Sequence, residues 1–300
     1  MGLDVAECVT RNEQVPLPRY EGLWDSIVVD RSVKDRLLRA AVLSMELRAT
    51  LPFHVTALHG LAVLTGPPGT GKSTLARGLA QQVAAVMGPK RARLIEVNPH
   101  GLMSAEHGQS QQRVTKLLTE IVPALADDGL PTIVLLDEVE SMAVARGAAS
   151  LSANPADVHR ATDAVLTALD DNASQFPHLF TVATTNFTSA LDEAFLSRSD
   201  ITVPMPLPDE VAINAILTDA LSGFATRYPA LAALAGDPQI RRVATYLVGR
   251  DGRAVRKLVT DAMLRRLDVT LDPNELRIDD LLAAAEAAVL HELEADSAAK

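Results

Sequence analysis

Aromatic side chains and cysteines are scarce in this chain of 300 residues. It has six Phe, three Tyr and one Trp, which leaves few rings to stack on the bases of single-stranded nucleic acid. The only cysteine, Cys8, cannot form an intramolecular disulfide, and no Cys/His cluster has the spacing of a zinc site. The 28 Lys and Arg against 38 Asp and Glu give a net charge of −10, which disfavours binding to phosphate backbones. We therefore expect no nucleic acid as a partner.

Long apolar runs are also lacking. No run approaches the roughly 18 residues that cross a bilayer, and no signal peptide opens the chain. We expect a cytoplasmic protein that does not contact membranes. Hydrophobic residues nevertheless make up 48% of the chain, so that a large core can be built, mainly from Ala, Leu and Val.

Short apolar runs alternate with helical patterns in the first two thirds of the chain. They predict five strands, at 61–65, 94–97, 132–136, 179–184 and 201–203. Strands buried on both faces and separated by helices are typical of a parallel α/β sheet with flanking helices. A helix is predicted at 32–51 with Ser32 as its N-cap. Residues 1–17 show little periodicity and are expected to form a tail.

The strand pattern stops after residue 205. The remaining segments at 209–224, 238–248, 254–267 and 278–295 all have helical periodicity. The sequence therefore predicts a large α/β domain over 18–205, followed by a small all-helical domain over 206–300.

A glycine-rich loop follows the first predicted strand and opens a helix. This context is the one that a P-loop requires, because backbone N–H groups and the helix N-terminus surround a β-phosphate. Lys72 is expected to reach the β- and γ-phosphates of ATP, and Ser73 to ligate Mg²⁺. The predicted nucleotide-binding residues of the loop are Gly66, Pro67, Pro68, Gly69, Thr70, Gly71, Lys72, Ser73 and Thr74.

Two carboxylates follow the predicted strand at 132–136. Asp137 is expected to hold the Mg²⁺ shell, and Glu138 to polarise a water toward the γ-phosphate. Such a pair is often only a solvated turn, but about 65 residues after a P-loop it indicates a Walker B element. The chain is therefore predicted to be an ATPase.

At this point the chain resembles the AAA+ ATPases. Asn186, after the fourth predicted strand, resembles the sensor-1 residue that positions the attacking water, although Asn is also a common turn former at strand ends. Arg198 resembles the arginine finger that acts on a neighbouring subunit's nucleotide. Most members have two arginines in this segment, whereas this chain has Arg198 alone. Arg253 matches sensor 2, which reaches the γ-phosphate from a helical lid.

Several further strings resemble the pachytene-checkpoint family, the AAA+ remodellers of HORMA-domain proteins, from about residue 18 to 270. They are PRYEGLWDSI from Pro18, PHGLMS from Pro99, DEVES from Asp137, AFLSRSDI from Ala194 and DGRAVRKL from Asp251. The resemblance implies a homo-hexamer that uses Mg-ATP to open a HORMA-domain protein, alone or bound to a cyclic-oligonucleotide synthase (CD-NTase). Only about 17 residues precede the Leu-Trp segment, as in compact bacterial members associated with CBASS antiphage systems. The resemblance thus implies a role in limiting this signalling.

The segment that matches the family's axial pore loop has no aromatic residue. Ala105, Glu106 and His107 stand after His-Gly-Leu-Met-Ser, where an aromatic would grip an extended peptide. We therefore expect a short pull on one terminal segment rather than processive threading.

Two other functions are compatible with an AAA+ fold. A clamp-loader or initiator type of ATPase acting on DNA is disfavoured by the acidic charge and by the lack of a helix-turn-helix signature. A nucleotide-locked scaffold is disfavoured because all the catalytic residue types are present. DNA-stimulated hydrolysis would favour the first function, and ATP binding without turnover would favour the second.

Overall fold

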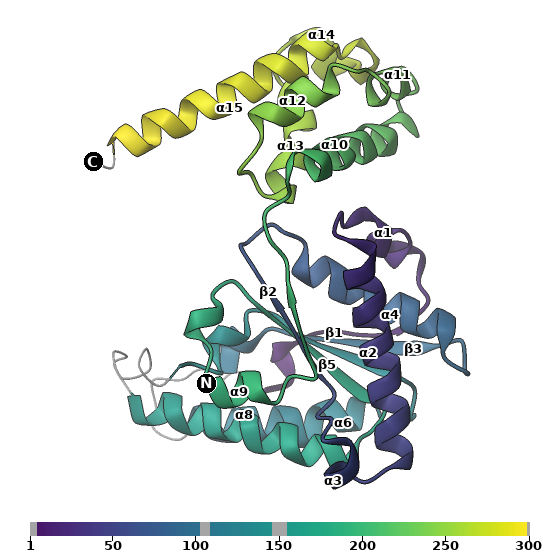
Figure 1. The fold of residues 1–300 in the computed structure, drawn as a ribbon, viewed down its shortest axis with the longest axis vertical. Helices are drawn as coiled ribbons and strands as arrows, with labels where there is room; N and C mark the ends of the chain where they lie inside the picture. Colours follow the sequence, from purple (N-terminus) through teal and green to yellow (C-terminus); the bar gives the residue numbers. More distant parts are fainter. Residues whose placement is uncertain (1–4, 103–108, 146–154, 299–300) are drawn as a thin grey trace. The chain divides into compact units, whose positions relative to one another are not determined.

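A computed structural model describes residues 5–102, 109–145 and 155–298 (Figure 1). The chain divides into two compact units. One comprises Met1–Trp24, Asp30–Gly66 and Lys72–Met205, and the other comprises Asp25–Val29, Pro67–Gly71 and Pro206–Lys300. The central part of the glycine-rich loop thus groups with the C-terminal helices, whereas its two ends belong to the α/β unit.

The α/β unit is built on one mixed sheet with the strand order β1-β3-β4-β5-β2-β6. All neighbouring strands are parallel except β1, which pairs antiparallel with β3. The strands are β1 (Val9–Val15), β2 (Leu61–Thr65), β3 (Ala92–Val97), β4 (Thr132–Leu136), β5 (Leu179–Thr185) and β6 (Ile201–Pro204). β2 and β4 have the predicted bounds, and β3, β5 and β6 differ by one or two residues at an end.

The prediction of a five-stranded, wholly parallel sheet is wrong in one respect, because the sheet has a sixth strand. β1 lies within the segment expected to be a tail. It is an edge strand whose exposure alternates along its length, with Thr10, Asn12 and Gln14 exposed and the charged Arg11 and Glu13 half-buried. Since only a strand buried on both faces produces a continuous apolar run, this edge strand escaped a search for such runs.

Helices cover both faces of the sheet (Figure 1). Strand residues such as Val63 and Val134 share one core cluster with Val165 of α8, and α4 contacts β3 and β4 together with α2. The principal helices of the unit are α2 (Arg31–Thr50), α4 (Lys72–Val86), α5 (Gln109–Lys116), α6 (Val122–Leu125), α8 (Pro155–Gln175) and α9 (Glu193–Ser197), with short α1 (Leu23–Ser26) and α3 (Phe53–Thr56).

The α2 helix begins one residue earlier than predicted. Its N-cap is Asp30, whose carboxylate accepts a hydrogen bond of 2.7 Å from the Ser32 backbone N–H. Ser32 was predicted to be the cap and instead supplies a capped N–H. Both residue types are good N-caps, so that sequence preference alone did not separate them.

The second unit is helical throughout its described C-terminal part. It contains α10 (Glu210–Ala225), α11 (Leu231–Ala235), α12 (Ile240–Tyr246), α13 (Gly252–Met263), α14 (Leu267–Leu271) and α15 (Ile278–Ala298). Buried Ile213, Leu217, Val243 and Val259 form part of its core. The helix predicted at 254–267 corresponds to α13, which ends at Met263, and the backbone is extended at Arg266 before α14 begins at Leu267. Among the described helices, none is both long and apolar enough to cross a membrane.

Candidate active site

The sheet register brings the predicted site residues to one edge. Thr65 pairs with Thr185, and Leu136 pairs with Ala183, so that β2, β4 and β5 end close together. The residues that follow these strands include Gly66, Asp137 and Asn186. Ligand sites of open α/β sheets lie at this carboxyl edge of the strands.

Gly66 is required where the chain leaves β2. Its φ is +148°, and a Cβ placed there would lie 2.0 Å from the carbonyl oxygen of Met205. Its N–H donates to the Thr185 carbonyl at 3.2 Å. Any side chain would displace the backbone at this point, which explains why glycine opens the loop.

Lys72 and Asn186, both predicted catalytic residues, are in direct contact. Lys72 begins α4, and its side chain is 7% exposed. Its ammonium donates to the Gly66 carbonyl at 2.7 Å and to Asn186 Oδ1 at 2.9 Å. A buried cation must be satisfied by polar partners, and here these partners hold the ammonium beside the start of the glycine-rich loop.

Ser73 and Asp137, the predicted Mg²⁺ ligands, are also paired. Ser73 Oγ donates to Asp137 Oδ1 at 2.6 Å, and Thr184 Oγ1 donates to the same oxygen at 2.5 Å. These are hard oxygen donors of the kind that Mg²⁺ takes from proteins, which usually supply one or two ligands beside substrate phosphates. The described residues contain no cluster of three or more His, Cys, Asp or Glu that could hold a metal.

Glu138 adopts a backbone conformation that is uncommon for a residue with a side chain. Its φ and ψ are +57° and +53°, in the left-handed region, which is found disproportionately at functional sites. Its N–H donates to Thr184 Oγ1 at 3.0 Å, and its carboxylate Oε1 lies 3.4 Å from Asn186 Nδ2. The strained turn thus directs the predicted general base toward Asn186.

Two residues of this site were missed by the sequence reasoning. Thr184 links Asp137 to the backbone of Glu138, and Glu140 Oε1 accepts the Asn186 N–H at 3.1 Å. Glu140 lies two residues after Glu138, and Thr184 lies two residues before Asn186. The signals that could have identified them are closeness in sequence to the predicted residues and, for Glu140, its place in the DEVES string.

A small cavity of about 230 Å³ borders the two carboxylates from the β1 side of the sheet. Its lining residues are Thr10, Arg11, Glu96, Val97, Asn98, Asp137 and Glu138. Glu96 is paired there with Arg11 at 3.1 Å and with Arg77 at 2.5 Å. The unpredicted strand β1 therefore contributes directly to the surroundings of the site.

The central loop residues meet the start of α13 inside the second unit. Gly69 has a φ of +78°, and a Cβ there would lie 2.1 Å from Asp251 Oδ1. Asp251 is the N-cap of α13 and accepts the backbone N–H groups of Arg253 and Ala254. The Arg253 N–H also donates to the Gly69 carbonyl at 3.2 Å. The backbone of the predicted sensor-2 residue is therefore in contact with the loop.

Arg253 and Arg256 differ in their surroundings. The Arg253 side chain is exposed, and within the described part of the chain no ion pair engages it. Arg256 donates to Asp219 at 2.8 Å and to the Ser26 carbonyl at 2.7 Å. Of the two arginines, Arg253 is the one whose guanidinium is available for a ligand.

Arg198 lies apart from this cluster. It is the C-cap of α9, and its guanidinium forms a two-pronged ion pair with Asp170 of α8, at 2.7 and 2.8 Å. Hydrogen bonding from Arg198 lowers the pKa of Asp170, and the same bond raises the pKa of Arg198. Among described residues, no hydrogen bond joins Arg198 to Lys72 or Glu138.

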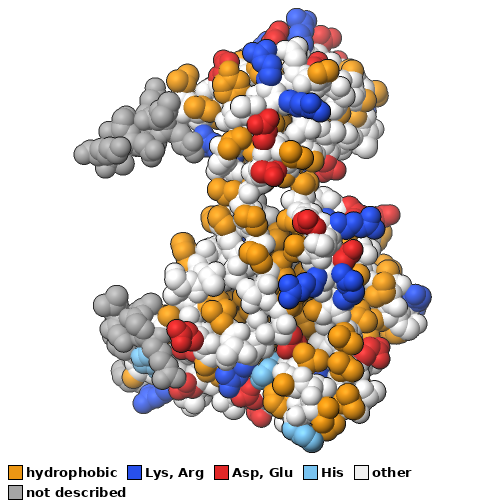
Figure 2. Space-filling model, in the orientation of Figure 1, with side chains coloured by type: hydrophobic (Ala, Val, Ile, Leu, Met, Phe, Trp, Pro, Cys, Tyr) orange, Lys and Arg blue, Asp and Glu red, His pale blue; other side chains and the backbone are white. Residues whose placement is uncertain are grey.

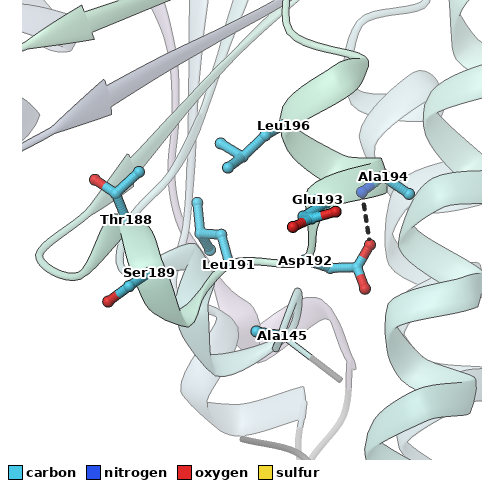
Figure 3. Close-up of a pocket in the computed structure, with 8 residues that line it drawn as sticks. All are labelled: Ala145, Thr188, Ser189, Leu191, Asp192, Glu193, Ala194 and Leu196. Carbon is cyan, nitrogen blue, oxygen red and sulfur yellow. Dashed lines mark hydrogen bonds between the residues drawn. The ribbon is translucent and has the colours of Figure 1, made fainter. Parts of the chain in front are cut away.

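A larger pocket, of about 620 Å³, lies beside the start of α9 (Figure 3). In Figure 3 the Asp192 carboxylate points to the Ala194 N–H that it caps, at 2.9 Å. The lining residues are Ala145, Thr188, Ser189, Leu191, Asp192, Glu193, Ala194 and Leu196. None of them is a predicted site residue, so this pocket is separate from the nucleotide site. The predicted pore-loop residues Ala105, Glu106 and His107 lie outside the described residues.

Comparisons with known proteins agree with this geometry. Residues 62–207 match the ATPase family associated with various cellular activities (AAA). CD-NTase-associated protein 6 of Pseudomonas aeruginosa is 45% identical over 276 residues, which cover 92% of this chain and 90% of that protein. A pachytene checkpoint protein 2 homologue of Arabidopsis thaliana is 37% identical over 191 residues, covering 62% of this chain and 40% of the plant protein.

Solved structures share the fold. The structure of C. elegans PCH-2 has a TM-score of 0.74 at 24% identity, covering 94% of this chain and 75% of the other. A HORMA:CdnC:Trip13 complex of E. coli MS115-1 contains a chain with a TM-score of 0.73 at 19% identity, covering 95% and 97%. The predicted AAA+ fold, ATPase activity and family resemblance are confirmed. The chain belongs to the AAA ATPases, which bind nucleotides, and among them to the pachytene-checkpoint family.

Proposed function

We propose that this chain is a Mg²⁺-dependent ATPase that opens a HORMA-domain protein, alone or bound to a CD-NTase, and thereby limits cyclic-oligonucleotide signalling in antiphage defence. The observation that carries the ATPase assignment is the contact of Asn186 with both Lys72 and Glu138. The assignment of the substrate is supported by the similarity to CD-NTase-associated protein 6 over nearly the whole of both chains.

The hydrolytic step follows from the placement of these side chains. Glu138 accepts a proton from water as the water oxygen bonds to the γ-phosphorus, and the bond to the bridging oxygen of ADP breaks. Asn186 holds the Glu138 carboxylate through Nδ2. Lys72 supplies positive charge to the β- and γ-phosphates, where negative charge develops. The burial of Lys72 at the start of α4 keeps this ammonium in place.

Ser73 and Asp137 are the residues that would hold Mg²⁺. Their oxygens already lie 2.6 Å apart, and both are suitable hard ligands. When bound, the ion neutralises charge on the β- and γ-phosphate oxygens. Thr184 would keep the Asp137 carboxylate oriented, because it donates to the same oxygen as Ser73.

Two arginines would complete the site from other parts of the assembly. We propose that residues 206–300 act as a lid whose Arg253 reaches the γ-phosphate, since this side chain is exposed at the start of α13. Arg198 would act on the nucleotide of a neighbouring copy in a hexamer. Its separation from Lys72 and Glu138 within the described α/β unit supports an action in trans.

The remodelling step is proposed to use the segment with Ala105, Glu106 and His107. Without an aromatic residue, its grip would depend on polar and charged contacts with a short terminus of the substrate, and such contacts weaken as salt increases. Remodelling should therefore fall with ionic strength more steeply than ATP hydrolysis does.

The test uses a HORMA-domain protein and its CD-NTase as a preassembled complex. Incubation with this protein and ATP should deplete the complex and reduce cyclic-nucleotide synthesis, whereas the Glu138→Gln variant should do neither. Survival of the complex through many ATP turnovers would refute remodelling and leave the ATPase assignment intact.

An action on DNA is less well supported. On the face drawn in Figure 2, Lys and Arg side chains are interspersed with Asp and Glu side chains, and the net charge of −10 opposes nucleic-acid binding. Stimulation of hydrolysis by duplex or single-stranded DNA at physiological salt would favour this second function.

A further inference from the structure

The guanidinium of Arg198 is held at three points inside its own chain. Nε donates to Asp170 Oδ1 at 2.7 Å, Nη2 donates to Asp170 Oδ2 at 2.8 Å, and Nη1 donates to the Ala194 carbonyl at 2.9 Å. A two-pronged pair of this kind fixes the plane of the guanidinium as well as its position. The direction of Arg198 is thus set by α8 and α9 together.

This arrangement leaves part of the guanidinium free to bind a ligand. Arginine has five N–H groups, and three of them are used by Asp170 and Ala194. One N–H therefore remains on Nη1 and one on Nη2. Donors on the two terminal nitrogens of a guanidinium can bind two oxygens of a phosphate. The Arg198 side chain is 23% exposed, so that part of it is accessible to solvent.

Asp170 is itself anchored by a third residue. His59 Nε2 lies 3.3 Å from Asp170 Oδ1, and because an aspartate carboxylate only accepts hydrogen bonds, Nε2 carries the hydrogen. The His59 backbone is fixed in turn, since its N–H and that of Gly60 donate to the two carboxylate oxygens of Asp200, at 2.8 and 2.9 Å. Burial is the main cause of the lowered pKa of His59.

We propose that Asp170 is a positioning residue that presents the Nη1 and Nη2 donors of Arg198 to a nucleotide bound by a neighbouring copy of this chain. This inference rests on the proposed action of Arg198 in trans. Arginine side chains have high rotamer entropy, and holding one in its working direction reduces the cost of binding. Asp170 would therefore speed hydrolysis at a site to which it does not itself belong.

The Asp170→Asn substitution tests this role with little change in shape. An asparagine has one acceptor and places an NH₂ group against an arginine N–H, so that the two-pronged pair is lost. We expect kcat to fall about tenfold, the scale of losing one charge-assisted pair, while KM for ATP stays close to that of the unchanged protein. Asp171→Asn is the matched control, because Asp171 is the next residue of the same helix, is exposed and carries the same charge.

Mixed rings separate this inference from the proposed function. Lys72→Ala subunits cannot hold ATP but retain Arg198, and they should restore hydrolysis to Arg198→Ala subunits, whose own ATP sites are intact. Lys72→Ala/Asp170→Asn subunits should restore about tenfold less, and Lys72→Ala/Asp171→Asn subunits should restore as much as Lys72→Ala alone. The Asp170 change then resides in a subunit whose own site is inactive, so that any loss has to act across the interface. Mass measurement confirms mixed rings, and melting temperature confirms folding.

Each outcome decides one of the two ideas. Full restoration by the Lys72→Ala/Asp170→Asn subunits would overturn the role of Asp170 and leave Arg198 as a trans-acting finger. A gain of activity in the Asp170→Asn protein would overturn it too, because Asp170 would then restrain Arg198. No restoration by Lys72→Ala subunits in confirmed mixed rings would refute the action of Arg198 in trans, and with it this inference.

Discussion

Lys72 and Asn186 are 114 residues apart in the chain, yet the lysine ammonium donates to the asparagine carbonyl oxygen at 2.9 Å. The other end of the same amide faces the Glu138 carboxylate. The Asn186 side chain therefore connects Lys72, which is proposed to bind phosphate, to Glu138, the proposed general base. A hydrogen bond from the Asn186 backbone N–H to the Glu140 carboxylate also helps to fix this position.

Asn186→Ala should therefore lower kcat by about tenfold to a hundredfold while changing ATP affinity much less, because positioning of the base contributes to the transition state more than to ground-state binding. Steady-state hydrolysis and equilibrium binding of a fluorescent ATP analogue measure the two effects. An equal loss in both measurements would instead show that Asn186 acts mainly through Lys72.

Glu138→Gln should retain ATP binding but reduce turnover by at least about a hundredfold, the range for removing a positioned general base. The substitution keeps the size of the side chain and leaves the Ser73–Asp137 pair untouched. Exposed Glu46 of α2 provides the control, and Glu46→Gln should behave as the unchanged protein. Hydrolysis by Glu138→Gln at the original rate would remove Glu138 from the mechanism.

Ser73→Ala should increase the Mg²⁺ concentration needed for half-maximal hydrolysis, because one of the two proposed protein ligands is lost. Ser73→Thr retains the hydroxyl and should restore the original dependence. A Mg²⁺ titration at saturating ATP measures this effect, and removal of Mg²⁺ with a chelator should stop hydrolysis in all three proteins. An unchanged titration curve for Ser73→Ala would argue against ligation by Ser73.

Stability should depend on pH through His178. Burial is the main cause of the lowered pKa of its imidazole in the folded protein, and Nε2 lies 3.0 Å from the Ala126 carbonyl. Because the unfolded chain binds a proton more readily, the stabilisation is fully present above the ordinary histidine pKa of about 6.5 and is lost as the pH falls from there through the lowered value.

The free energy of unfolding should therefore decrease as the pH falls below about 6.5, and His178→Gln should show a smaller decrease. His59 contributes in the same direction, since burial lowers its pKa as well. Exposed His54 is the control, and His54→Gln should leave the slope unchanged. Denaturant titrations at each pH provide the measurement, and an identical slope in His178→Gln would contradict the assignment.

The parts of this fold that were predictable from sequence are those in which local composition and burial coincide. β2 and β4 are buried along their whole length, and their apolar runs marked their bounds. β1 is half exposed and carries charged residues, and its pairing with β3 depends on residues 77 to 88 positions away. Helix breaks such as the one at Arg266 were missed because the apolar periodicity continues across them.

In the candidate site, too, some residues could be predicted from their local sequence and others could not. Gly66, Lys72, Asp137, Glu138 and Asn186 each stand directly after a buried strand or at the start of a helix, where motif and position reinforce one another. Asp170 has no such mark, since it is one of several acidic residues on α8. Only the packing of α8 against α9 shows that it meets Arg198.

Gly66 and Met205 stand at two points where the chain leaves the α/β unit for the second unit. Gly66 immediately precedes the loop segment Pro67–Gly71, and Met205 immediately precedes the C-terminal helices. Their backbones are in contact, and the Met205 N–H donates to the Thr65 carbonyl at 2.6 Å. A side chain at position 66 would therefore disturb both exits of the chain at once, because it would press on the carbonyl of the residue that leads into the C-terminal helices.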